Sequence, residues 1–413
     1  MVYNLTLVFT ILTFIFTTLV TFKSKGAIPI LWMHFWLLVS VINPLKLNFS
    51  PTIIAIFVNF STLFALIGYI VGSKYGNFSP TSRSSLHLIK KRTLNTYYLM
   101  CVPISILAYF SFKLLQNISI FKYRRMILSE PENLFGHPLI LPIFQLFIEG
   151  ILLLLLLSSI YFLLENKSKY LIIFSLIIAI LFSVIFLGRY HIYRIIVVTF
   201  VFALVQLRSA HILKLFPSFA IMVFIVVYGT VLRSGGLFGV QEIFIKHVIG
   251  YHTFGYNLAE SYVISAENLI DRTWLGGSMI ASIFYFLLKP LQYIYDFTTY
   301  LQSADYYEQD IFKYLGTIKY SNKSLDLNAN AFYTIFTDIW RDFSWLGVAF
   351  FFPIGFLTGF SYRGLVQKNY YLAISYYIIS YVFLFAQMKN PFVRHEMFIP
   401  MFFAFFVLFM RKK

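Results

Sequence analysis

The sequence predicts an all-α, polytopic integral membrane protein with about eleven transmembrane helices and one long external segment. Of its 413 residues, 59% are apolar and only 12% are charged, and the mean hydropathy is +0.77. A soluble domain carries roughly 25% charged residues, so a water-exposed surface of ordinary composition is excluded. The apolar residues also form windows of about 20 residues, which is the length a helix needs to cross the hydrocarbon core.

The predicted spans are separated by connections that carry most of the charged residues. They comprise residues 2–22, 27–45, 52–72, 95–115, 138–164, 170–187, 195–207, 215–232, 345–362, 370–387 and 396–410. The first window lacks a basic n-region and a small-residue cleavage site, so it is predicted to be a mature span. The window at 195–207 is short, and it either re-enters the membrane or is extended by Tyr193 and by the snorkelling Arg194 and Arg208.

Lysine and arginine set the predicted orientation. Basic residues gather in alternate connections, such as Lys90, Lys91 and Arg92 and the closing residues 411–413. Such connections are retained in the cytoplasm, which places the N-terminus outside. The excess of 33 basic over 16 acidic residues therefore reflects topology, not nucleic-acid binding. Nearly all the acids fall on the outer side in this arrangement, so the chemistry is predicted to face outward.

The domain organisation follows from one long connection. Residues 1–234 form a predicted N-terminal bundle, residues 235–344 an external segment over the outer mouth, and residues 345–413 the closing helices. A structureless loop of this length is improbable. Its apolar stretch at residues 276–295 predicts an interfacial or re-entrant helix. The tyrosines nearby suit either interfacial anchoring or sugar stacking.

Several arginines lie on the predicted outer side, against the usual bias. A guanidinium is permanently charged and presents a fork that matches a diphosphate. Each of these residues could instead snorkel to lipid phosphates, but together they predict an anionic ligand at the outer membrane surface. The candidate ligands of that anion are Arg189, Arg194, Arg233, Arg272, Arg341 and Arg394.

Three residues are candidates for acid–base chemistry. Glu149 stands inside an apolar helix, so it must be paired, protonated or facing a polar cavity. Its alternative role is that of a buried partner for Arg189, Arg194 or a backbone group. His252 and Glu260 follow in the external segment, where a structural role is the alternative. Walker, zinc-protease, serine-hydrolase and dinucleotide signatures are absent, and the single cysteine, Cys101, excludes a cysteine-based metal site.

Several sequence features resemble one family. The turn LGRYHIYR lies between two apolar blocks, and VLRSGG ends the following outward span. A closing pattern consists of Asn330, Asp342, Phe343, Gly347 and Gly355, with Ser344 where the pattern often has glycine. Together with the number of spans and the external segment, these features resemble the bacterial oligosaccharide repeat-unit polymerases. These Wzy-type O-antigen or capsule polymerases are membrane glycosyltransferases of the C type.

The resemblance implies a metal-independent glycosyltransferase of the bacterial inner membrane, without a cofactor, whose active site faces the periplasm or exterior. Its substrate would be an undecaprenyl-diphosphate-linked oligosaccharide of lipopolysaccharide or related polysaccharide biosynthesis. Membrane lipid and a chain-length regulator protein are the other candidate partners, and nucleic acid is not one. An O-antigen ligase, a lipid-linked oligosaccharide flippase and a polyprenyl-monophosphate sugar transferase remain alternatives. For this reaction Glu149 is the leading candidate for the base, ahead of His252 and Glu260. Arg189, Arg194 and Arg233 would stabilise the leaving diphosphate, with Arg272, Arg341 and Arg394 as secondary contacts.

Overall fold

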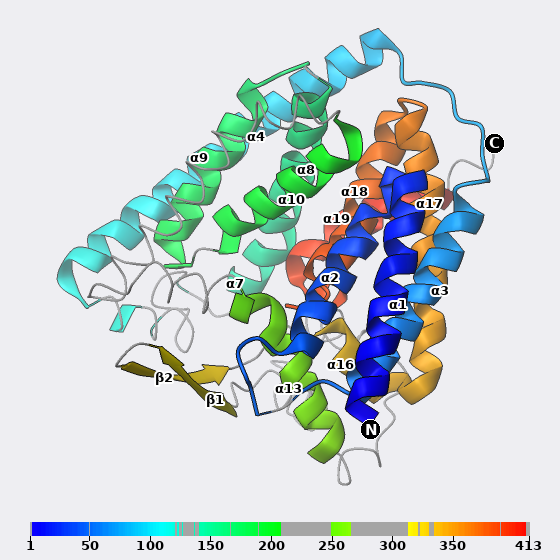
Figure 1. The fold of residues 1–413 in the computed structure, drawn as a ribbon. Helices are drawn as coiled ribbons and strands as arrows, with labels where there is room; N and C mark the ends of the chain where they lie inside the picture. Colours follow the sequence, from blue (N-terminus) through cyan, green and yellow to red (C-terminus); the bar gives the residue numbers. More distant parts are fainter. Residues whose placement is uncertain are drawn as a thin grey trace, which may run out of the picture. The chain divides into compact units, whose positions relative to one another are not determined.

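A computed structural model describes most of the chain. The described residues are 2–48, 50–119, 122–123, 126, 136, 140–165, 167–188, 190–207, 249–265, 313–320, 323–329, 334–388 and 390–409. This part is mainly helical, and six of its helices are long and apolar enough to cross a membrane (Figure 1). Shorter apolar helices are Tyr170–Ile185, Tyr190–Gln206, Tyr370–Phe385 and Glu396–Phe409. The predicted helical membrane architecture is confirmed, whereas the count of eleven spans is not, because residues 215–232 lie outside the described part.

The chain forms two compact units, each assembled from segments that are distant in sequence. Unit 1 consists of Met1–Gly76, Gly236–Arg363 and Ile379–Arg394. Unit 2 consists of Asn77–Gly235, Gly364–Ile378 and His395–Lys413. The predicted division at residues 234 and 344 separates parts by their side of the membrane, which is a different criterion, and it stays a prediction.

Unit 1 is built around three helices that contact one another. Its elements are α1 (Val2–Lys23), a 3₁₀-helix (Lys25–Ala27), α2 (Ile28–Ile42), α3 (Ile53–Gly72), α13 (Tyr251–Ser265), β1 (Lys313–Tyr320), β2 (Lys323–Ala329), α16 (Ile335–Phe343), a 3₁₀-helix (Ser344–Phe350), α17 (Phe351–Val366) up to Arg363, the end of α18 (Tyr370–Phe385) and a 3₁₀-helix (Pro391–Val393). Helices α1, α2 and α3 pack against one another, and α13 packs on α2 and α3 (Figure 1).

Hydrogen bonds join three polar side chains inside unit 1. The Nδ2 of Asn59 donates to Thr10 Oγ1 at 2.9 Å, and a 2.8 Å hydrogen bond joins His34 Nε2 to Asn59 Oδ1. All three side chains are buried. Because an unpaired polar group in an apolar interior costs free energy, these bonds link α1, α2 and α3 in one register.

Glycines allow α3 and α17 to approach closely. A Cβ added to Gly355 would lie 2.0 Å from the carbonyl oxygen of Ala65, and one on Gly359 would lie 2.1 Å from that of Tyr69. On α3, Gly68 and Gly72 meet the backbone of α17 just as closely. Any larger residue would force the two backbones apart, which explains the spacing of these glycines by four residues on both helices.

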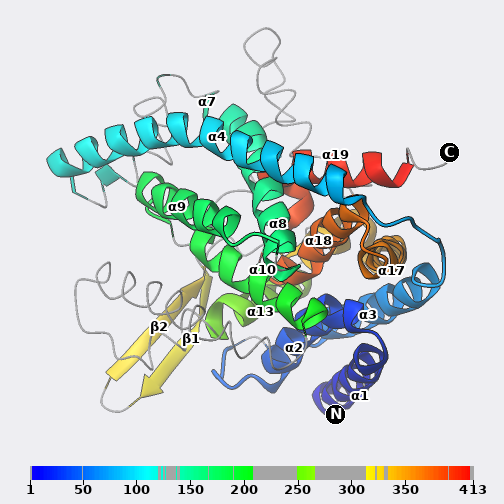
Figure 2. The ribbon, with the colours of Figure 1, turned by 90° about the horizontal axis from the view of Figure 1, so that it is seen from above.

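Unit 2 is a second helical cluster. Its elements are α4 (Arg83–Asn117), α7 (Ile140–Ile143), a π-helix (Phe144–Glu149), α8 (Gly150–Leu164), α9 (Tyr170–Ile185), α10 (Tyr190–Gln206), the first part of α18 and α19 (His395–Phe409). Helix α9 lies in contact with α4, α8 and α10 (Figure 2). Helix α19 packs on α8 and on the π-helix.

The structure corrects three details of the sequence prediction. Helix α4 has 35 residues and begins at Arg83, twelve residues before the predicted span. Helix α10 begins at Tyr190, so the predicted turn at residues 188–194 is largely helical. Within the predicted external segment, β1 and β2 form an antiparallel hairpin, which departs from the all-α expectation. The re-entrant helix predicted at residues 276–295 lies outside the described residues.

Candidate active site

Glu149 occupies an unusual position in the helical backbone. It ends a six-residue π-helix that joins α7 to α8. Such segments are rare, because they replace the i→i+4 bond by an i→i+5 bond, and they are frequent at functional sites. The Glu149 side chain is only 6% exposed. A carboxylate at this depth in a membrane helix is costly and marks a candidate functional group.

The π-helix is fixed from one side by α19. A Cβ on Gly150 would lie 3.2 Å from the Cβ of Ile399 and 3.4 Å from the carbonyl oxygen of Glu396. Glu396 is itself buried, in the first turn of α19, where a helix dipole stabilises a carboxylate. The sequence interpretation gave Glu396 no role, and its place beside the π-helix adds a second acid to this part of unit 2.

Arg194 lies inside α10 and not at its end. Its side chain is 6% exposed, although hydropathy predicted a snorkelling residue at the membrane surface. Its Nη2 donates to His191 Nδ1 at 3.4 Å, and its guanidinium carbon lies 5.7 Å from the ring centroid of Tyr190. Tyr190 and His191 lie four and three positions before Arg194, so each is a neighbour of Arg194 on the helix surface. This spacing would have identified His191 if the segment had been interpreted as a helix.

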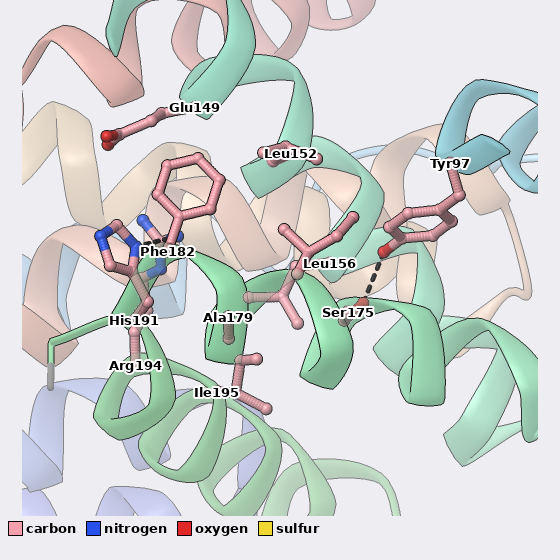
Figure 3. A pocket seen from close by; sticks show the side chains of 11 residues that line it. Tyr97, Glu149, Leu152, Leu156, Ser175, Ala179, Phe182, His191, Arg194 and Ile195 are labelled. Carbon is pink, nitrogen blue, oxygen red and sulfur yellow. Dashed lines mark hydrogen bonds between the residues drawn. The ribbon is translucent and has the colours of Figure 1, made fainter. Parts of the chain in front are cut away.

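Glu149 and Arg194 meet at one cavity within unit 2, together with His191. The cavity lies between α4, α8, α9 and α10 and is lined by Tyr97, Glu149, Leu152, Leu156, Ser175, Ile178, Ala179, Phe182, His191, Arg194 and Ile195. Glu149, His191 and Arg194 lie toward one end in Figure 3. The cavity offers about 20 Å³ to the centre of a water-sized molecule, which is room for water and not for a sugar. A larger ligand would require the surrounding helices to separate, or would approach the polar end from outside.

The opposite end of the cavity is closed by hydroxyl groups. A hydrogen bond of 2.5 Å joins Tyr97 Oη to Ser175 Oγ (Figure 3). A second, of 2.9 Å, joins Tyr97 Oη to Ser159 Oγ. These bonds connect α4, α8 and α9. The side chains between the two ends are apolar, so the acid, the imidazole and the guanidinium are confined to one end of the cavity.

The other two base candidates lie in unit 1, on α13. Glu260 is fully buried, and its Oε1 accepts from Thr52 Oγ1 at 2.5 Å and from the Ile53 N–H at 3.1 Å. Its Oε2 accepts from the Ile54 N–H at 2.9 Å. Glu260 therefore satisfies the first backbone donors of α3, a role that favours stability.

His252 is held between tryptophans. Its ring stacks on Trp36 with centroids 3.9 Å apart and an interplanar angle of 17°. Trp32 meets the same ring edge-on at 5.9 Å. The imidazole is buried, so this arrangement favours packing of α13 on α2.

Of the other five candidate arginines, two lie among the described residues. Arg341 lies on α16, and Arg394 is half-buried just before α19. Arg189, Arg233 and Arg272 lie outside the described residues. The predicted convergence of six arginines therefore stays a prediction.

Four residues of the closing pattern, Asp342, Phe343, Gly347 and Gly355, lie in the described part of unit 1. Asp342 is fully buried on α16, one turn after Asp338, whose Oδ2 accepts from Asn390 Nδ2 at 2.7 Å. A Cβ on Gly347 would lie 2.3 Å from Ile339 Cγ2, so only glycine fits there. Asn330 lies outside the described part.

Among the described residues, no three His, Cys, Asp or Glu side chains gather as metal ligands.

No protein-family model, no curated protein and no solved structure matches the chain.

Proposed function

We propose that this protein is a membrane glycosyltransferase that polymerises undecaprenyl-diphosphate-linked oligosaccharide repeat units at the outer face of the bacterial cytoplasmic membrane. The observation that carries the proposal is that two buried residues, Glu149 and Arg194, line the same end of one cavity inside a bundle of apolar helices. An acid and a guanidinium are the two groups that the reaction requires when no metal ion takes part. The resemblance of the sequence to repeat-unit polymerases supports the same reaction.

The proposed step forms one bond and breaks another. The acceptor hydroxyl at the non-reducing end of the incoming repeat unit attacks the anomeric carbon of the growing glycan. The new C–O bond forms as the bond from that carbon to the diphosphate oxygen breaks, and undecaprenyl diphosphate leaves. The hydroxyl proton passes to a base, for which Glu149 is the leading candidate.

The leaving diphosphate needs positive charge. Arg194 supplies a fork of N–H donors for its oxygens. Arg189 and Arg233 are proposed to share this work, with Arg272, Arg341 and Arg394 as further contacts. In the proposed orientation α8 enters from the outside and α10 begins there, so Glu149 and Arg194 lie toward the outer face.

Deletion of the gene in its host, followed by gel analysis of the surface glycan, tests this proposal. Loss of a polymerase leaves single repeat units on the surface. Free polymer would indicate a ligase, and absence of any surface product would indicate a flippase. Either of the last two results would contradict the proposed function.

A further inference from the structure

His191 lines the cavity but has no part in the proposed reaction. Its ring packs against Phe182, with centroids 4.8 Å apart, and so has a fixed place between α9 and α10. From there its Nδ1 faces the Nη2 of Arg194 at 3.4 Å. His191 is half-buried and Arg194 is buried, so the pair is partly enclosed by unit 2.

The chemistry of this contact determines the state of the imidazole. A guanidinium has only donors, so Nδ1 must be the acceptor and must carry no proton. The ring is then the neutral tautomer with its proton on Nε2. An imidazolium in the same place would present a second positive charge to Arg194 and would repel it.

Tyr190, one helical turn before Arg194, also contacts the guanidinium. Its ring lies 5.7 Å from the guanidinium carbon of Arg194, a distance at which a cation is attracted to an aromatic face. Arg194 is thus held by two residues of the preceding turn of its own helix. A guanidinium that is already oriented loses less conformational freedom when it binds an anion.

We infer that His191 is a positioning residue, whose unprotonated Nδ1 holds the Arg194 guanidinium in place for a diphosphate group. The naming of diphosphate as the ligand rests on the proposed function. His191 itself contacts no reacting atom in this inference. It acts through Arg194, as an acceptor and not as an additional cation.

Three substitutions distinguish these roles. His191→Asn keeps an acceptor close to the position of Nδ1, His191→Lys supplies a cation without an acceptor, and His191→Phe removes both. The purified protein in nanodiscs is titrated with undecaprenyl diphosphate, and polymer formation is measured separately. His191→Phe and His191→Lys are expected to weaken binding about tenfold, whereas His191→Asn stays within about threefold of the native protein. His87, which is exposed on α4, receives the same three substitutions as a control without effect.

A double substitution tests whether the histidine acts through the arginine. If it does, His191→Phe causes no further loss of binding in an Arg194→Ala background. Four results would overturn the inference. The first is rescue by Lys instead of Asn, and the second is an equal loss in all three variants. The others are full binding by His191→Phe and no binding by the native protein. If the native protein binds undecaprenyl diphosphate in this His191-dependent way but forms no polymer, the proposed function fails and the inference stands.

Discussion

Glu260 in unit 1 and Glu149 in unit 2 are both buried glutamates on helices, yet their surroundings differ in kind. Both oxygens of Glu260 accept hydrogen bonds from the start of α3. Glu149 ends a π-helix and lines a cavity beside Arg194 and His191. Burial alone therefore does not identify a catalytic acid. The two glutamates differ in their surroundings: the carboxylate of Glu260 accepts hydrogen bonds from backbone N–H groups, whereas Glu149 lines a cavity.

Glu149→Gln should have the largest effect on the reaction. The amide keeps the shape of the side chain but cannot accept a proton, so we expect polymer formation to fall about 100-fold or more at an unchanged protein level. Initial rates with lipid-linked repeat units measure this. Glu165→Gln, at the other end of α8, is the matched control and should retain activity. A normal rate for Glu149→Gln would remove the distinction between the two glutamates and move the search for the base to His252.

Arg194→Lys should have the next largest effect. Lysine keeps the charge but loses the planar fork and the orientation given by Tyr190 and His191, so we expect about a tenfold loss of polymer. Arg363→Lys is the control, because the Nη1 of Arg363 donates to the Ser73 carbonyl oxygen in unit 1. If both variants form polymer equally well, Arg194 is a structural cation and not a diphosphate ligand.

Glu260→Gln should affect stability and not chemistry. The amide group cannot accept the hydrogen bonds that one carboxylate oxygen now receives, which leaves at least one buried donor of α3 unsatisfied. We expect a loss of about 1–3 kcal/mol in the free energy of unfolding, measured by denaturation in detergent. Polymer formed per folded molecule should be unchanged. A folded Glu260→Gln protein of normal stability but without activity would reverse the assignment of the two glutamates.

Tyr97→Phe should have the smallest effect. The substitution removes the hydroxyl that closes the far end of the cavity, but Ser159 and Ser175 also donate to the carbonyl oxygens of Leu155 and Leu171. Because those bonds persist, we expect a loss of only about 0.5–1.5 kcal/mol in unfolding free energy and little change in rate. A large loss of activity would show that the reactive part of the cavity extends to Tyr97.

The sequence predicted helices well where hydropathy and length agree. Helix α3 was expected at residues 52–72 and lies at Ile53–Gly72. Helix α10 starts at Tyr190, before the predicted span at residues 195–207. The predicted start was late because Tyr190, His191 and Arg194 lower the local hydropathy although they continue the helix. Hydropathy does not register that polar residues can continue a helix when they contact one another on its surface, as the half-buried Tyr190 and His191 contact the buried Arg194.

Parts of the candidate site were beyond sequence reasoning for a different reason. The partners of Glu260 lie more than 200 residues away in the chain, at a helix start that no local pattern connects to it.

The hairpin carried a local signal that was missed. Aromatic and β-branched residues recur around Tyr314, Thr317 and Ile318, and polar and apolar residues alternate from Ser324 to Asn328.

The lengths of the helices in unit 2 have a consequence for the surrounding lipid. Helices α9 and α10 have 16 and 17 residues. At about 1.5 Å per residue they extend roughly 24–26 Å, which is less than the ~30 Å hydrophobic thickness of a bilayer. Such a mismatch is relieved by local thinning of the membrane. If the proposed lipid-linked diphosphate approaches the start of α10, thinning there would shorten the distance from its headgroup to Arg194. We then expect access to depend on the acyl-chain length of the host membrane.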